Sequence, residues 1–137
     1  MRAADVFLDT NVVLYLLSAD ARKADVAETL IQRGGTVSVQ VLNEAAAVAR
    51  RKLQMPLAEI REWLAAVRAC CAVVPLTVAE HDEALRLCER YALAFYDALI
   101  VAAALAAGAQ VLYTEDLQPG LVIDGRLQVV NPFAVDN

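Results

Sequence analysis

Histidine is almost absent from this chain of 137 residues, because His81 is the only one. This scarcity excludes the histidine-based catalytic triads and the usual zinc sites that depend on histidine ligands. His81 itself lies among acidic residues at what reads as an exposed helix start, so we assign it no chemical role. Lysine is nearly as scarce, since none follows Lys52. Any hydrolytic chemistry must therefore be carried by other groups.

Cysteine occurs only three times, as Cys70, Cys71 and Cys88. The count is odd, adjacent cysteines rarely pair with each other, and no Cys-x-x-Cys spacing occurs. We expect all three to be reduced residues of the core or of an interface. The chain also lacks a confident transmembrane segment, because its most apolar stretch, 98–113, is short and interrupted by glycine and glutamine. With no signal-peptide pattern at the N-terminus, we expect a cytoplasmic protein without membrane contact.

An apolar fraction of 59% with 21% charged residues indicates a folded protein rather than a disordered one. The length fits a single domain, which we place over residues 1–137. A net charge of −5 disfavours a nucleic-acid partner, because phosphate binding depends on lysine and arginine. The run Arg50-Arg51-Lys52 is a local exception. It either forms an ordinary solvated helix face or holds a polyanion beside an acidic site.

Short apolar runs alternate with longer helical segments along the chain. The expected strands are 6–8, 36–39, 72–75, 110–113 and 126–130, and the expected helices, with their cap residues, are 11–18, 20–33, 40–54, 56–70, 77–91 and 95–107. This alternation predicts an α/β domain around a parallel sheet, because parallel strands need crossover helices. Ligands of such sheets bind at the carboxyl ends of the strands.

Four acidic residues stand at or soon after the points where apolar segments stop. Asp9 ends the first expected strand, Glu44 follows the second by one turn, and Asp116 follows the fourth. Asp97 lies in the first turn of an apolar helix and is the only charged residue within 91–114. Carboxylates near a core are costly unless a cation pairs with them, and hard divalent ions prefer carboxylate oxygens. The pattern predicts that the four acids converge at one edge of the sheet and bind a divalent metal ion.

Each acid also has an ordinary structural explanation. Asp9 and Asp97 could cap helices, Glu44 could be a surface residue, and Asp116 could belong to a turn. These explanations do not account for an acid at every candidate strand end on one side of the sheet. They also leave Asp97 beside an apolar helix without a partner.

The residues around the four acids form motifs that resemble those of a known family. The motifs are Phe7-Leu8-Asp9-Thr10-Asn11, Ser38-x-x-Val41-Leu42-Asn43-Glu44, Tyr96-Asp97-Ala98-Leu99-Ile100 and Tyr113-Thr114-Glu115-Asp116. They resemble the four acidic motifs of the PIN domain, and their spacing is most similar to that of VapC-type toxins of type II toxin–antitoxin modules. The resemblance spans residues 6–133. It implies a three-layer α/β/α domain with a central, mainly parallel five-stranded sheet.

The resemblance also implies a function. We expect an endoribonuclease that depends on magnesium or manganese and cleaves RNA, such as tRNA or rRNA, by two-metal-type hydrolysis. The residues carried over as catalytic and metal-binding acids are Asp9, Glu44, Asp97 and Asp116. Asn11 and Thr114 are expected as nearby polar helpers that contact the substrate. Glu115 places a second acid beside Asp116, and of the two we favour Asp116 for the metal.

Chemical roles follow from the charges. We expect Asp9 and Asp97 to hold the main ion, Asp116 to complete its shell, and Glu44 to orient the attacking water or support a second ion. Products should carry a 5′-phosphate and a 3′-hydroxyl, because this route does not use the ribose 2′-hydroxyl as nucleophile. The run Arg50-Arg51-Lys52 is expected to bind RNA phosphates that flank the cleaved bond.

The expected partners follow from the same resemblance. It implies inhibition by a cognate VapB-type antitoxin, homodimerisation, and further assembly of two toxin–antitoxin pairs. We expect the apolar residues Trp63, Leu64 and Val67 to be exposed on their helix and covered by these partners.

Other classes compete with this hypothesis. A haloacid-dehalogenase-like phosphatase needs a second aspartate where Asn11 stands, and a receiver-like phosphoacceptor needs a lysine late in the chain, where none occurs. A PIN-fold RNA-processing nuclease outside a toxin–antitoxin module, or a catalytically silent PIN-fold binding module, stays open.

Overall fold

The computed structural model describes residues 1–134, and these form an α/β domain. The strands are β1 (Val6–Leu8), β2 (Thr36–Ser38), β3 (Ala72–Val74), β4 (Val111–Tyr113), β5 (Val122–Ile123) and β6 (Leu127–Val130). The helices are α1 (Thr10–Tyr15), α2 (Ala21–Arg33), α3 (Val39–Arg51), α4 (Leu57–Cys70), α5 (Val78–Tyr91) and α6 (Phe95–Ala106). One turn of 3-10 helix, η1 (Ala3–Asp5), precedes the first strand.

The strands form one sheet in the order β3-β2-β1-β4-β6-β5. Neighbouring strands from β3 to β6 are parallel, and β5 pairs antiparallel with β6 at the edge. The predicted α/β fold with a mainly parallel sheet is confirmed. The sheet has one strand more than expected, because the turn at Asp124 and Gly125 folds the two residues of β5 back onto β6. A pairing of two residues leaves no periodic pattern in the sequence.

β1 lies at the centre of the sheet, between β2 and β4, where the strand order reverses direction. The chain first builds outward through β2 and β3 on one side and then returns to add β4 and β6 on the other side. Such a reversal opens a crevice beyond the carboxyl ends of the two strands concerned. The segments that follow β1 and β4 therefore start side by side.

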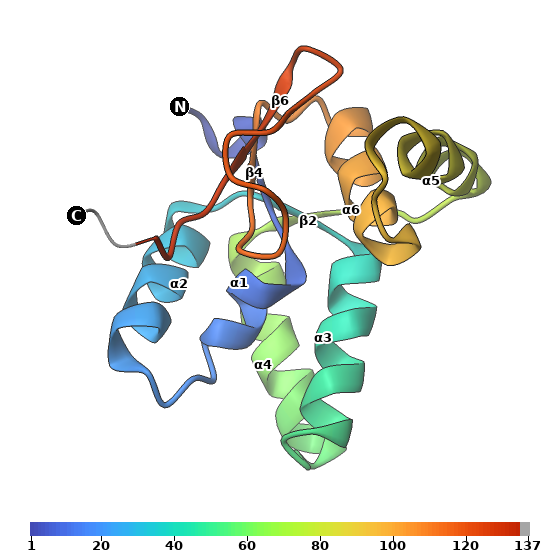
Figure 1. Ribbon diagram of the computed structural model, residues 1–137. Helices are drawn as coiled ribbons and strands as arrows, with labels where there is room; N and C mark the ends of the chain where they lie inside the picture. The colour runs from blue at the N-terminus through green and yellow to red at the C-terminus, as the bar shows by residue number, and fades with distance from the viewer. Residues whose placement is uncertain (135–137) are drawn as a thin grey trace.

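The core explains why these segments hold together. Phe7, Leu8 and Leu112 are fully buried in the two central strands, and every residue of α6 from Ala98 to Leu105 is buried. Helix α6 packs against α5 on one side and β2 on the other, which is why it carries almost no polar residue. Figure 1 shows α5 and α6 side by side, and α3 and α4 side by side below the sheet.

Helix α4 corrects one expectation. Val67 is buried, and Trp63 and Leu64 are half-buried against the core, so the prediction that all three are exposed is wrong. The three residues and Ile60 repeat at helical spacing along one side of α4, and this side packs against α2 and α3. They serve the fold and offer little free apolar surface to a partner.

The cysteines form no disulfide within the described residues, and Cys70 is exposed rather than part of the core, while Cys88 is half-buried. Cys71 is buried, and burial raises the pKa of its thiol to about 11. Among residues 1–134, no helix is both long enough and apolar enough to cross a membrane.

Candidate active site

The candidate site lies at the carboxyl ends of β1 and β4. Leu8 pairs with Tyr113, and the backbone N–H of Asp9 donates to the carbonyl of Tyr113 over 3.0 Å. Parallel pairing thus brings Asp9 beside Thr114, although 104 residues separate them along the chain. Strand β2 ends at Ser38, whose side chain caps the N-terminus of α3. Helix α3, which carries Glu44, therefore begins at the same edge of the sheet.

Asp9 is the most deeply buried acid of the site, with 3% of its surface exposed. One carboxylate oxygen accepts from the backbone N–H of Thr10 over 2.6 Å, and the other accepts from the hydroxyl of Thr114 over 2.7 Å. Asp9 is also the N-cap of α1, so the capping explanation holds for one of its oxygens. The second oxygen points towards the loop after β4.

Asn11 and Thr114 connect two of the acids. The amide nitrogen of Asn11 donates to Thr114 Oγ1 over 3.0 Å and to Asp116 Oδ2 over 3.1 Å. The hydroxyl of Thr114 donates a hydrogen bond to Asp9 and accepts hydrogen bonds from Asn11 and from the backbone N–H of Asp116. These three hydrogen bonds use the full capacity of the Thr114 hydroxyl. The two polar residues predicted beside the acids therefore fix Asp9 relative to Asp116.

Glu44 is held by two residues that the sequence analysis did not assign to the site. The hydroxyl of Thr10 donates to one carboxylate oxygen over 2.6 Å, and the amide of Gln40 donates to the other over 3.2 Å. Both donors are buried, with 8% of their surface exposed. Gln40 stands four residues before Glu44 on α3, a spacing that places them on one helix face, so this pair has a signal in the sequence.

Asp97 lies in the first turn of α6 and is half-buried. The N-cap of that helix is Ala94, which makes no side-chain cap, so Asp97 is not a capping residue. Within residues 1–134 its carboxylate has no hydrogen-bond donor. Of the four acids, it is the one whose oxygens stay free for another ligand.

The charges of the four acids act on one another. Burial raises the pKa of Asp9 to about 7, against the lowering effect of its hydrogen bonds from Thr114 and Thr10, and the charges of Asp116 and Asp97 raise it further. Burial also raises the pKa of Asp97, and the charges of Asp116 and Glu44 add to this. None of the ion pairs found within residues 1–134 involves any of the four acids. The cluster is therefore an uncompensated region of negative charge, and we call these four residues the acidic site.

Glu115 does not belong to this cluster, although it precedes Asp116 directly. The Tyr15 hydroxyl donates to Glu115, and the ammonium of Lys23 lies 3.5 Å from its carboxylate. The same ammonium donates to the Tyr15 hydroxyl over 3.0 Å. Glu115 is thus neutralised by α1 and α2, and of the two adjacent acids it is Asp116 that reaches Asn11.

A hollow of about 570 Å³ opens at the acidic site, and we call it the acidic hollow. The residues that line it come from α1, α3, the start of α6 and the loop after β4: Thr10, Asn11, Leu14, Glu44, Ala47, Val48, Arg51, Tyr96 and Asp116.

The structure separates the three members of the predicted basic run. Arg51 lines the acidic hollow, Lys52 lines a neighbouring hollow of about 330 Å³, and Arg50 is exposed and lines neither. RNA binding by Arg50 and Lys52 stays a prediction, while Arg51 has a position beside the acids.

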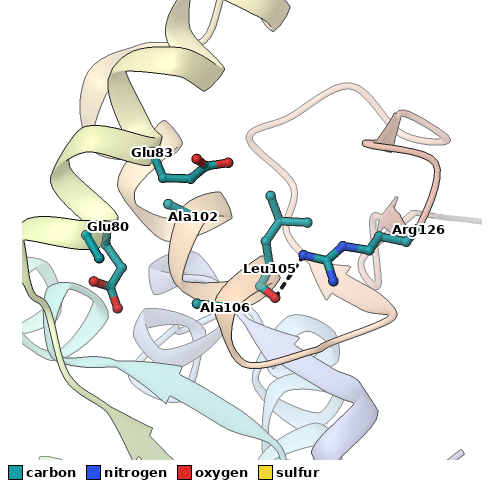
Figure 2. Close-up of a pocket in the computed structure, with 7 residues that line it drawn as sticks. Glu80, Glu83, Ala102, Leu105, Ala106 and Arg126 are labelled. Carbon is teal, nitrogen blue, oxygen red and sulfur yellow. Dashed lines mark hydrogen bonds between the residues drawn. The ribbon is translucent and has the colours of Figure 1, made fainter.

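Another hollow, of about 280 Å³, lies between α5 and α6, and Figure 2 shows the residues around it. Small side chains such as Ala102 and Ala106 form its floor, and the guanidinium of Arg126 donates to the carbonyl of Leu105 over 3.2 Å. None of the four acids lines this hollow. It is not a candidate for the active site.

The PIN domain family matches this chain over residues 6–119, which include all four acids. The chain belongs to the PIN domain family. Among curated protein sequences, none matches it.

Solved structures show the same fold. A toxin–antitoxin complex from Klebsiella pneumoniae superposes with a TM-score of 0.69 at 22% identity, over 95% of this chain and 99% of that chain. VapC20 of Mycobacterium tuberculosis, described as a sarcin-ricin loop cleaving toxin, gives 0.63 at 22% identity, over 81% and 91%. FitAcB from Neisseria gonorrhoeae gives 0.63 at 17% identity, over 95% and 99%. At these identities the likeness establishes the fold.

Whether this PIN domain can bind a divalent ion depends on the atoms that it offers as metal ligands. The four carboxylates supply the hard oxygen ligands that magnesium or manganese prefers. They also repel one another and form no ion pair with a cationic side chain among residues 1–134, so a bound cation would neutralise them. Within residues 1–134 no three such side chains are already arranged to hold an ion. Asp9 and Glu44 instead accept hydrogen bonds from neighbouring residues, so binding requires some of the side chains to rotate. The four carboxylates are suitable ligands for such an ion, and their side-chain rotamers must change when it binds.

Asp9→Asn should stabilise the PIN domain in chelator at neutral pH. The folded-state pKa of Asp9 is about 7, against 3.8 for an ordinary aspartate, so the folded protein binds this proton more tightly than the unfolded chain does. Wild-type stability therefore falls as the pH rises from about 4 to about 7, and the variant lacks this loss. The shift corresponds to at most about 4 kcal/mol, of which poorer hydrogen bonding by an amide removes about 1–3 kcal/mol.

Thermal melts of the two proteins between pH 4 and pH 8 measure this effect. The melting temperature of Asp9→Asn minus that of the wild type should increase with pH. Asp82→Asn removes an exposed carboxylate on α5, so it serves as the control and should give a constant difference. A constant difference for Asp9→Asn as well would show that ionisation of the buried Asp9 carboxylate does not destabilise the folded protein.

Proposed function

We propose that this chain is a divalent-metal-dependent endoribonuclease that acts as the toxin of a type II toxin–antitoxin module. The observation that carries the proposal is the convergence of Asp9, Glu44, Asp97 and Asp116 from four separate segments, with no cationic partner in the part of the chain that the structure describes. Burying such a group is unfavourable for stability, so a function that needs the negative charge is the simplest reason for it.

The family and the similar structures support the same choice. PIN domains are in general divalent-metal-dependent nucleases, and this chain matches the family along most of its length. Two of the similar structures are a toxin–antitoxin complex and a toxin described as sarcin-ricin loop cleaving. We carry RNA as the substrate and the toxin role over to this chain as part of the proposal.

In the proposed reaction, Asp9, Asp97 and Asp116 hold a magnesium or manganese ion, with Glu44 at the edge of the site. When bound, such an ion lowers the pKa of a water molecule and neutralises charge on the phosphate. Asp97 suits this role because its carboxylate has no other partner among the described residues.

The remaining residues position these groups. Thr10 and Gln40 each donate one hydrogen bond to Glu44, which leaves further lone pairs of its carboxylate able to orient the attacking water. Asn11 and Thr114 keep Asp9 and Asp116 at a fixed separation while substrate binds. Attack by water, with departure of the ribose 3′-oxygen, gives a 3′-hydroxyl and a 5′-phosphate.

The proposal includes partners. A VapB-type antitoxin would block the acidic hollow, and the toxin would form homodimers and larger toxin–antitoxin assemblies in the cytoplasm. The support comes from two similar structures, a toxin–antitoxin complex from Klebsiella pneumoniae and VapBC2 from Rickettsia felis bound to a DNA fragment from their promoter. Half-buried Trp63 and Leu64 contribute less to such contacts than the sequence alone indicated.

The decisive experiment is incubation of the purified chain with a structured RNA such as tRNA. Cleavage should require magnesium or manganese, stop in chelator and return when the ion is restored. The new ends should be a 5′-phosphate and a 3′-hydroxyl, which end-labelling with and without phosphatase distinguishes. Undiminished cleavage in chelator, or 2′,3′-cyclic phosphate ends, would contradict the proposal.

A further inference from the structure

Tyr96 stands out beside the acidic site because a large aromatic side chain is left in solvent. It directly precedes Asp97 in the first turn of α6, and 62% of its surface is exposed. Its hydroxyl has no hydrogen-bond partner among residues 1–134. The side chain nevertheless lines the acidic hollow together with Asp116 and Glu44.

The ring is held by neighbouring aromatic groups. Phe95 packs edge-on to Tyr96 with ring centroids 5.8 Å apart, and His81 packs edge-on to Phe95 at 5.7 Å. These three rings form a row that begins at His81 on α5, outside the hollow. The ring of Tyr96 therefore packs against Phe95 on the side away from the hollow. A supported ring loses less conformational freedom on binding than a free surface side chain does.

The opposite wall of the hollow is one face of α3. Glu44, Val48 and Arg51 repeat at helical spacing, so they lie in a row along this helix. Arg51 comes seven positions after Glu44 on the helix, which corresponds to a rise of about 10 Å. The hollow therefore has an acidic end at the proposed metal site, an apolar middle and a cationic end.

A polyanion needs more than charge to stay in this hollow. The whole chain carries a net charge of −5, and Arg51 is the only basic residue among those that line the hollow. A single phosphate contact contributes little at physiological salt. Stacking of a base on an aromatic ring, by contrast, raises the affinity about fivefold to a hundredfold and does not depend on charge.

On the basis of the proposed ribonuclease function, we propose that Tyr96 is a stacking platform for an unpaired base beside the cleaved bond, and that Arg51 contacts a phosphate of the same strand. The preferred substrate is then RNA whose nucleotide at the cleavage site is unpaired, as in a loop or a single strand. A base inside a duplex is already stacked on its neighbours and cannot use the ring. Tyr96 is a positioning residue in this scheme, since the reacting atoms lie at the acidic site.

Steady-state cleavage of a short single-stranded RNA by Tyr96→Ala and Tyr96→Phe tests the platform. Tyr96→Ala should raise KM by about fivefold to a hundredfold and leave kcat at saturating RNA near the wild-type value. Tyr96→Phe should restore KM, because stacking uses the ring and not the hydroxyl. Val78→Ala, an exposed apolar residue on α5, is the matched control and should change neither constant.

Arg51→Ala and Arg68→Ala form a second matched pair, since both residues are exposed in the last turn of a helix, α3 and α4 respectively, and only Arg51 lines the hollow. For Arg51→Ala, the slope of log KM against log salt should become shallower by about 0.7, the contribution of one phosphate contact on a single strand. Arg68→Ala should keep the wild-type slope. Equal slopes for the two variants would overturn the contact to Arg51.

The outcomes separate this inference from the proposed function. If the wild type cleaves RNA in magnesium and Tyr96→Ala keeps its KM, the platform is overturned while the nuclease stands. If Tyr96→Ala loses kcat with unchanged KM, or if Tyr96→Leu restores KM as well as Tyr96→Phe does, stacking is also overturned. If the wild type neither binds nor cleaves RNA, the proposed function fails and the inference fails with it.

Discussion

Replacing Asp97 with asparagine should lower kcat for RNA cleavage by about a thousandfold or more while the domain stays folded. Asp97 has no hydrogen-bond partner among residues 1–134, so the fold does not depend on its charge. Its carboxylate is the ligand most free to bind an ion, and an asparagine is a weaker ligand for magnesium. A thousandfold loss corresponds to about 4 kcal/mol of transition-state stabilisation, within the range expected for metal-assisted hydrolysis.

The measurement is the single-turnover rate on tRNA over a magnesium titration, with the melting temperature of each protein recorded beside it. Asp82→Asn removes an exposed carboxylate from α5 and should keep the wild-type rate, which controls for loss of charge alone. Melting of Asp97→Asn at or above the wild-type temperature shows that the loss is chemical. A rate equal to that of the wild type would remove Asp97 from the metal site and with it the main support for the mechanism.

The sequence predicts the fold well because its signals are local. Short β-branched or apolar runs such as Thr36–Ser38 and Ala72–Val74 form strands, and their helices begin close to where caps and proline indicate. Parallel strands then place their carboxyl ends at one edge, whatever the details of packing. The convergence of the four acids follows from this rule, which is why it could be predicted from one sequence.

The choice between Glu115 and Asp116 could not be decided by the same means. Both carboxylates follow β4 and both are compatible with the motif. Their roles separate because Tyr15 on α1 and Lys23 on α2 bind Glu115, and because Asn11 binds Asp116. These are tertiary contacts across about a hundred residues, and neither the period nor the spacing of the sequence encodes them.

Which face of each helix is exposed and which is buried could not be predicted fully from the sequence either. The sequence places Trp63, Leu64 and Val67 on one helix side, but it does not show that α2 and α3 cover that side. In the basic run, consecutive residues point about 100° apart around a helix, so one of the three, Arg51, lines the acidic hollow. Tyr96 is the reverse case, because an aromatic residue in an apolar segment reads as core and proves to be exposed. Which neighbours cover a face is decided only when the helices are packed together.

Expression of the wild-type chain without its partner should arrest bacterial growth. A nuclease is catalytic, so even a turnover of about 1 s⁻¹, low for an enzyme, lets each copy cleave many RNA molecules in one generation. Inducible expression followed by counts of viable cells measures the effect. Asp97→Asn, induced to the same protein level, should permit normal growth, because it retains the fold and every surface except the metal ligand.

Co-expression of the protein encoded by the gene directly upstream should restore growth if that gene is the antitoxin. The restoring partner must block the acidic hollow or its approach, so it should also stop RNA cleavage in the purified complex. Relief of growth arrest and loss of cleavage should follow the same dependence on the amount of partner. Unimpaired growth with wild-type protein that cleaves RNA in vitro would contradict the toxin role and leave an RNA-processing nuclease. Growth arrest by Asp97→Asn to the same degree would show that toxicity does not come from the acidic site, because that variant keeps the domain and loses only the ligand.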